Sequence, residues 1–167
     1  MIDLNQELDV LDPVEFTNLP LSSIRDEHSA AQTCERFIAF YFGDKLYCVV
    51  AEMVAEVIHP LSVAILPNAP RGVLGIAALR GEVVTVLSLK DLLKEESGAA
   101  NAKSKMIVLQ RNENETQFAI PVDRMHEVVM LPSHMGAAEL VRRIEHEGSV
   151  FNLIDIERLS AEISIQF

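Results

Sequence analysis

The sequence predicts an all-β protein, a sandwich or a barrel, in which helices are few and short. From Arg36 onward, strand-like apolar segments follow one another at short spacing, and turn formers such as Gly43-Asp44 and Arg80-Gly81 separate them. Hydrophobic residues make up 49% of the 167 residues, which is enough for a sizeable core. Aromatic residues make up only 5% and Trp is absent, so we expect a core of Val, Ile, Leu, Ala and Met.

Apolar patterning and turn residues define the expected elements in chain order. They are a strand pair over 36–50, a strand over 53–59, a short strand over 63–72 that runs into a turn, a hairpin over 73–87, a short helix over 88–97, a hairpin over 105–122, a strand over 125–131, a hairpin over 140–154 and a short helix over 155–163. For 53–61 and 136–147, a pair of solvated helices is the alternative.

The first 35 residues differ from the rest in charge and periodicity. Eight of the 25 acidic residues but one of the 14 basic residues fall within 1–35, which leaves 17 acids and 13 bases for 36–167. Weak periodicity and many turn formers predict a flexible acidic arm over 1–35. The formal net charge of −11 argues against nucleic-acid binding. With no secretory signal, no membrane-length apolar run and two cysteines expected to be free thiols, we expect a cytoplasmic protein.

The two halves of the sequence resemble each other. Tyr47–Ile58 aligns with Phe118–Val129, and Gly81–Leu93 aligns with Gly148–Ser160. Chance similarity between hairpins is one explanation, and two similar small barrels packed together are the other. In this alignment the counterpart of Arg80 is Glu147, so the fold does not require the charge at that turn.

The sequence contains no pattern that supports catalysis or metal binding. Its five histidines do not pair at metal-ligand spacing, and the motifs of nucleotide-binding and hydrolytic enzymes are absent. The Gly72–Gly75 stretch lies inside a strand pattern and predicts a bulge or a close backbone approach rather than a phosphate-binding loop. We therefore expect a protein without enzymatic activity, cofactor or metal.

Four stretches resemble the CheW family of bacterial chemosensory coupling proteins. They are "FYFGDKLYCVVAEMVAEVI", "LPNAPRGVLGIAALRGEVVTVLSLKDLL", "FAIPVDRMHEVVML" and "GSVFNLIDIERL", and the similarity extends from about Arg36 to Leu159. The resemblance implies two similar SH3-like five-stranded β-barrel subdomains, intertwined within one domain over 36–164. It also implies a non-enzymatic adaptor that joins a CheA-type histidine kinase, through its regulatory domain, to the cytoplasmic tip of methyl-accepting chemoreceptors. Such an adaptor is expected to be recruited from the cytoplasm to receptor arrays, without inserting into the membrane itself.

The resemblance also assigns candidate binding residues. Val54, Glu56 and Arg80 match family positions tied to partner binding, Gly75 matches a glycine of the same region, and Val128 matches a receptor-facing position on the second barrel. We expect the kinase to bind at strand edges and apolar side chains around Gly75 and the hairpin that follows it.

The sequence departs from the family pattern at several positions. These are Ala78 for Asn, Thr85 for Pro, Ser88 for Asp, Lys90 for Arg and Ala119 for Gly. A parallel pathway that controls surface motility or a second messenger is therefore an alternative to flagellar chemotaxis. A small-molecule-sensing barrel that regulates a signalling partner is the alternative from another functional class, and an apolar pocket between the barrels would favour it.

Overall fold

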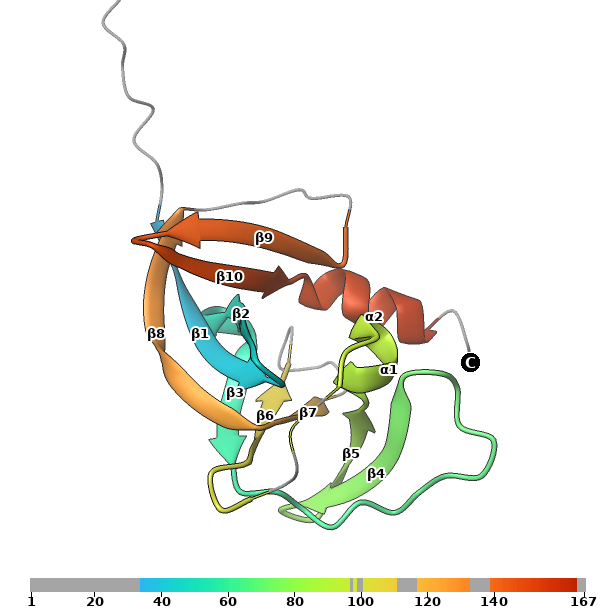
Figure 1. The fold of residues 1–167 in the computed structure, drawn as a ribbon. Helices are drawn as coiled ribbons and strands as arrows, with labels where there is room; N and C mark the ends of the chain where they lie inside the picture. The colour runs from blue at the N-terminus through green and yellow to red at the C-terminus, as the bar shows by residue number, and fades with distance from the viewer. Residues whose placement is uncertain (1–33, 97, 99–100, 111–116, 133–138, 165–167) are drawn as a thin grey trace, which may run out of the picture. The chain divides into compact units, whose positions relative to one another are not determined.

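The computed structural model describes residues 34–96, 98, 101–110, 117–132 and 139–164, which form two five-stranded sheets with three short helices (Figure 1). The strands are β1 (Cys34–Phe42), β2 (Lys45–Val50), β3 (Val54–Ile58), β4 (Val73–Leu79), β5 (Glu82–Leu87), β6 (Lys105–Leu109), β7 (Phe118–Val122), β8 (Arg124–Pro132), β9 (Val141–His146) and β10 (Ser149–Ile154). The helices are the 3-10 turn η2 (Ala51–Met53), α1 (Leu89–Leu93) and α2 (Ile156–Ser164). The predicted all-β class is confirmed.

The two sheets have the same topology. Sheet 1 has the strand order β8-β1-β2-β10-β9, and sheet 2 has the order β3-β6-β7-β5-β4. In each, two antiparallel hairpins are joined by one parallel pair, and the register of that pair is equivalent: Asn152 faces Tyr47 in sheet 1, and Thr85 faces Phe118 in sheet 2. The offsets match those of the sequence alignment, so the predicted internal repeat is confirmed.

Each sheet takes strands from both halves of the chain. The first half contributes β1 and β2 to sheet 1 and β3, β4 and β5 to sheet 2. The second half contributes β6 and β7 to sheet 2 and β8, β9 and β10 to sheet 1. The two subdomains are therefore intertwined, because each is completed by strands from the other half.

The structure resolves the alternatives left open for two segments. The helical interpretation is wrong for Val54–Ile58 and for Val141–His146, which form strands β3 and β9. Strand β1 begins at Cys34, so Cys34 and Glu35 belong to the sheet and not to the predicted arm. The rest of that arm lies outside the described residues.

The buried apolar side chains form three clusters. One cluster belongs to each sheet alone, and the third is shared by both sheets and lies between them. Strand β6 shows why its sequence is apolar from Met106 to Leu109. Met106 and Val108 pack inside sheet 2, whereas Ile107 and Leu109 point the other way, into the cluster that both sheets share. A strand that is buried on both faces needs apolar residues at every position.

Two equivalent residues begin the helices that follow the repeated hairpins. The Ser88 hydroxyl accepts a hydrogen bond from the Asp91 N–H at 3.3 Å, and the Asp155 carboxylate accepts one from the Arg158 N–H at 3.0 Å. Both side chains thus act as N-caps. Leu89 of α1 and Leu159 of α2 are buried in the shared cluster, so both helices close the space between the sheets.

Candidate partner-binding surface

The structure brings together two of the five candidate residues, Arg80 and Glu56. The Arg80 Nη2 atom lies 2.7 Å from the Glu56 Oε2 atom, and the two side chains are 78% and 22% exposed. Arg80 occupies the first position of the two-residue β4–β5 turn and Glu56 lies on β3. The guanidinium is thus held at one point while most of its surface faces solvent.

The stability of the turn does not explain why Arg80 is an arginine. Its φ of 52° lies in the left-handed region, as does the φ of 89° at Gly81, so the backbone has the signs of a type I′ turn. An L-residue there costs roughly 1–2 kcal/mol. An exposed ion pair contributes about 0.2–1 kcal/mol, which does not offset that cost. Glycine or asparagine would suit the turn better, so the side chain itself is the feature to explain.

The ion pair joins the two ends of sheet 2. In the strand order β3-β6-β7-β5-β4, Glu56 and the Arg80 turn belong to opposite edges of the sheet. The chain after β3 also reaches β4, because the Ala64 and Ile76 main chains exchange hydrogen bonds of 2.7 and 2.9 Å. These two links bring the edges of sheet 2 together.

Gly75 is buried, and its lack of a side chain allows the Ala64 main chain to lie against β4. A Cβ atom built on Gly75 would lie 2.2 Å from the Ala64 carbonyl oxygen, and the β4–β5 register shifts between Val73 and Gly75. The bulge and the close backbone approach predicted for the Gly72–Gly75 stretch are both confirmed. Because Gly75 is covered by Ala64 and Val63, a substitution there acts on folding before it acts on any partner.

The other two candidate residues lie apart from the ion pair. Val54 is half-buried and packs against the shared core cluster, at a register shift between β3 and β6. Val128 lies on β8 of sheet 1 and is 62% exposed. Its repeat counterpart, Val57 on β3, is also exposed, so both equivalent strands present an apolar side chain to solvent.

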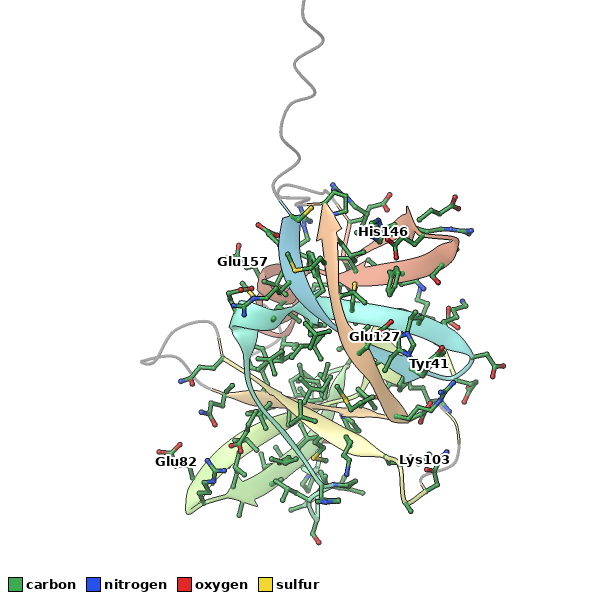
Figure 2. The ribbon with its side chains drawn as sticks, turned by 90° about the vertical axis from the view of Figure 1, so that its left-hand side faces the viewer. Tyr41, Glu82, Lys103, Glu127, His146 and Glu157 are labelled. Carbon is green, nitrogen blue, oxygen red and sulfur yellow. The ribbon has the colours of Figure 1, made fainter. Side chains whose placement is uncertain are left out.

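An apolar patch lies around Gly75 and the hairpin that follows it, where we expect the kinase to bind, although none of its residues is among the five candidates. We call it the hairpin patch, and it consists of Ile65, Leu74, Ala78 and Val83, all exposed, with Ile65 79% and Val83 65% exposed. Figure 2 shows the neighbouring Glu82 at the free end of the β4–β5 hairpin, pointing away from the fold. The signal was present in the sequence, because β4 and β5 are apolar on the alternate positions that should be polar in a half-exposed hairpin.

The departures from the family pattern are compatible with local structure. Ser88 caps α1, and the Lys90 Nζ atom lies 2.7 Å from the Glu96 carboxylate. The hydrogen bond that Lys90 donates to Glu96, together with the negative charge of Glu96, raises the pKa of Lys90, so this side chain stays positively charged. Ala119 is fully buried inside sheet 2. Its counterpart in the alignment is Cys48 of sheet 1, which is also fully buried.

The described residues include no group of three or more His, Cys, Asp or Glu side chains that could hold a metal ion. In the same part of the chain no helix is long and apolar enough to cross a bilayer. Burial raises the pKa of the Cys48 thiol to about 12, so it remains protonated and unreactive at neutral pH.

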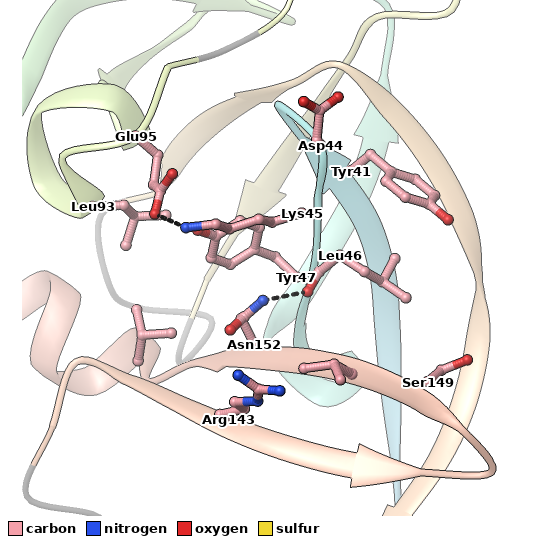
Figure 3. A pocket seen from close by; sticks show the side chains of 12 residues that line it. Tyr41, Asp44, Lys45, Leu46, Tyr47, Leu93, Glu95, Arg143, Ser149 and Asn152 are labelled. Atoms are coloured by element: carbon pink, nitrogen blue, oxygen red, sulfur yellow. Dashed lines mark hydrogen bonds and ion pairs between the residues drawn. The ribbon is translucent and has the colours of Figure 1, made fainter.

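A groove of about 590 Å³ lies between the β1–β2 hairpin, the β9–β10 hairpin and the end of α1 (Figure 3). Among the residues that line it are the charged side chains Asp44, Lys45, Glu95 and Arg143. It is therefore not the apolar pocket that a small-molecule sensor would need.

Comparisons with known proteins agree with this architecture. The curated chemotaxis protein CheW of Helicobacter pylori is 28% identical over 96 residues, which cover 58% of this chain and 57% of that protein. The chain thus matches little more than half the length of this relative. The crystal structure of the scaffolding protein TtCheW from Thermoanaerobacter tengcongensis superposes with a TM-score of 0.62 at 20% identity, covering 74% of this chain and 90% of that one. The model of the CheW-like domain matches residues 36–164. This chain therefore belongs to the CheW-like domain family.

Proposed function

We propose that this chain is a non-enzymatic adaptor that couples methyl-accepting chemoreceptors to a CheA-type histidine kinase. The pathway is chemotaxis or a parallel pathway with a motility or second-messenger output. Family membership supports this proposal, as do the names of the two relatives, a chemotaxis protein and a scaffolding protein. The observation that carries it is the exposed Arg80 side chain, which Glu56 orients and which the turn does not need for stability. The adaptor acts in the cytoplasm, at receptor arrays on the membrane.

The receptor tip binds at Arg80 and at the exposed Val128. A guanidinium has five N–H donors, and the contact with Glu56 uses the Nη2 side of it. The remaining donors face solvent, where they can pair with carboxylates and main-chain carbonyls of a helical hairpin. Glu56 positions the arginine, and the stem of Arg80 covers apolar surface while its head stays in contact with polar groups.

The kinase regulatory domain binds at the hairpin patch. Leu74 and Val83 expose apolar side chains on the β4–β5 hairpin, and Ile65 does so on the segment that Ala64 bridges to β4; exposed apolar surface of this kind marks sites of protein–protein interaction. Gly75 and Ala64 hold the segment that carries Ile65 against β4. The kinase thus uses the outward face of the β4–β5 hairpin in sheet 2, whereas the receptor uses the Arg80 turn of that sheet together with Val128 of sheet 1.

Replacement of the guanidinium tests the receptor assignment. We expect Arg80→Ala to weaken binding of a receptor hairpin fragment by roughly 1–3 kcal/mol, the range for an interface anchor, while stability changes by no more than about 0.5 kcal/mol. Arg80→Lys should recover part of the loss, because it keeps the charge but not the planar fork. Glu147→Ala, at the equivalent turn, is the matched control. Calorimetric titration measures all three, and unchanged affinity in Arg80→Ala would refute the assignment.

A further inference from the structure

Strands β2 and β10 pair over only part of their length, and the groove of Figure 3 lies at their first residues, where they are not paired. Each strand has six residues, but their parallel ladder contains two pairs, Asn152 with Tyr47 and Leu153 with Cys48. The strands therefore run apart over Lys45 and Leu46 on one side and Ser149 and Val150 on the other. All four of these residues line the groove.

Main-chain groups of both strands face this groove. His146 and Ser149 flank a two-residue turn and form a hydrogen-bonded pair. The next pair along the ladder, Glu145 and Val150, is therefore a non-hydrogen-bonded pair. Val150 accordingly directs its N–H and C=O away from β9 and toward the groove. On the opposite wall, Leu46 and Tyr41 of β1 also form a non-hydrogen-bonded pair, so the main-chain groups of Leu46 point away from β1. The Asn152 side-chain amide donates a hydrogen bond to the Leu46 carbonyl oxygen at 3.0 Å.

The wall formed by the β1–β2 hairpin is held in place from behind. The Asp123 Oδ2 atom accepts hydrogen bonds from the Gly43 N–H at 2.6 Å and from the Gly98 N–H at 2.9 Å. Lys45 forms an ion pair with Glu95, just after α1. These contacts tie the hairpin to the chain that follows α1, away from β10, so the groove is a fixed feature of the fold.

The charges of the groove are arranged along it. Lys45 and Glu95 neutralise each other, which leaves Asp44 at the β1–β2 turn and Arg143 on β9 as the two charges at opposite rims (Figure 3). Arg143 also contacts Glu145 on its own strand at 3.2 Å, in an exposed pair that contributes little. Between the rims lie the buried Tyr47 ring and the apolar side chains of Leu93 and Val141.

We propose that this groove binds an extended peptide segment of a partner protein, which adds along β10 as a strand. Main-chain hydrogen bonds to Val150 supply the attachment by strand addition, at the part of β10 that the β2–β10 ladder does not include. Charge complementarity sets the side chains: an acidic residue toward Arg143, a basic residue toward Asp44, and apolar residues between them. None of the five candidate binding residues lines the groove, so this site is separate from the proposed receptor and kinase surfaces and can be tested independently of them.

A displayed library of short random peptides, selected on the full chain and then measured against Val150→Pro, tests this proposal. Proline removes the N–H that faces the groove and leaves the β9 ladder intact, and Val83→Pro, at the equivalent position of β5, is the matched control. We expect selected peptides to share the acidic–apolar–basic pattern. Their affinity should fall about tenfold or more in Val150→Pro, as for one lost hydrogen bond, and stay unchanged in Val83→Pro.

Charge reversal provides a second measurement that does not depend on the fold of the proline variant. Arg143→Glu should weaken the same peptides, and replacing their acidic residue with lysine should restore binding to Arg143→Glu alone. Slower amide hydrogen exchange at Val150 in the complex would locate the peptide on β10. A library that yields no binders, or binders that ignore both Val150→Pro and Arg143→Glu, would overturn the proposal.

Discussion

The β4–β5 and β9–β10 hairpins occupy equivalent places in the two sheets but present different surfaces. Both are closed by two residues with positive φ, Arg80-Gly81 at 52° and 89° and Glu147-Gly148 at 49° and 77°. Their strand registers correspond over the five pairs next to the turn and differ only beyond Gly75, where β4 has a bulge that β9 lacks. Yet the outward pair is Ala78 with Val83 in the first hairpin and Glu145 with Val150 in the second.

This difference separates what the fold requires from what it leaves free. Turn geometry, register and inward-facing side chains are repeated, so they belong to the architecture. The charge at the turn and the polarity of the outward face are not repeated, so they are available for function. Of these two hairpins, the one with the apolar outward face also has the cationic turn, and it lies in sheet 2, where we place the kinase and the Arg80 part of the receptor site.

The largest effect is expected at Gly75, whose counterpart in β9 is Arg142. Gly75→Ala would force the Ala64 main chain away and undo the contact that brings the edges of sheet 2 together. We expect a loss of stability of about 3 kcal/mol or more, in the range of overpacking combined with broken hydrogen bonds. Urea unfolding measures it. Gly81→Ala, where no atom lies within 4 Å of the added Cβ, should cost only about 1 kcal/mol, and equal losses would contradict this account.

The next effect concerns the outward faces of the two hairpins. Val83→Asp should weaken binding of the kinase regulatory domain by about 2 kcal/mol or more, because it places a charge in the hairpin patch. Val150→Asp makes the same change on the other hairpin and should leave kinase affinity unchanged. Surface plasmon resonance with both variants checks this, and similar losses in the two would show that the patch does not distinguish the hairpins.

The two sheets also differ in a buried core position, where Cys48 in sheet 1 corresponds to Ala119 in sheet 2. The pKa of Cys48 is raised to about 12, so its contribution to stability is complete below the pKa of the unfolded thiol and is lost as the pH rises toward 12. At pH 10.5 the loss should be roughly 2 kcal/mol, at about 1.4 kcal/mol per pKa unit above 9. Urea unfolding at pH 7.5 and 10.5 should show this loss in the natural chain and a smaller one in Cys48→Ala.

The smallest effect is expected from exchanging the turn charges. Arg80→Glu would place a carboxylate beside Glu56 and should lower stability by about 0.5–1 kcal/mol, whereas Glu147→Arg should change it by less than about 0.5 kcal/mol. Thermal unfolding at low and high salt checks both, because added salt should reduce the first effect. A destabilised Glu147→Arg would indicate that the second turn also depends on its charge.

The sequence was sufficient for features that depend on neighbouring residues. Alternation and turn chemistry located the strand pairs, the Arg80-Gly81 bend and the helix that Ser88 begins. Features that depend on distant contacts were not predictable in the same way. The Arg80–Glu56 pair forms because sheet 2 brings its edges together, and the β2–β10 groove forms because two strands from different halves diverge. The short strand predicted within 63–72 is wrong, because Ala64 forms only an isolated bridge to β4 and the neighbouring Ile65 is exposed.

The exchange of strands between the halves has a consequence for signalling. Neither half holds a complete sheet, so damage to one sheet removes support from the other, and the domain should unfold as one cooperative unit. Under the proposed function, unfolding of one copy would remove its receptor-facing and kinase-facing surfaces together, so that copy would leave an array and would not remain there bound to a kinase without a receptor.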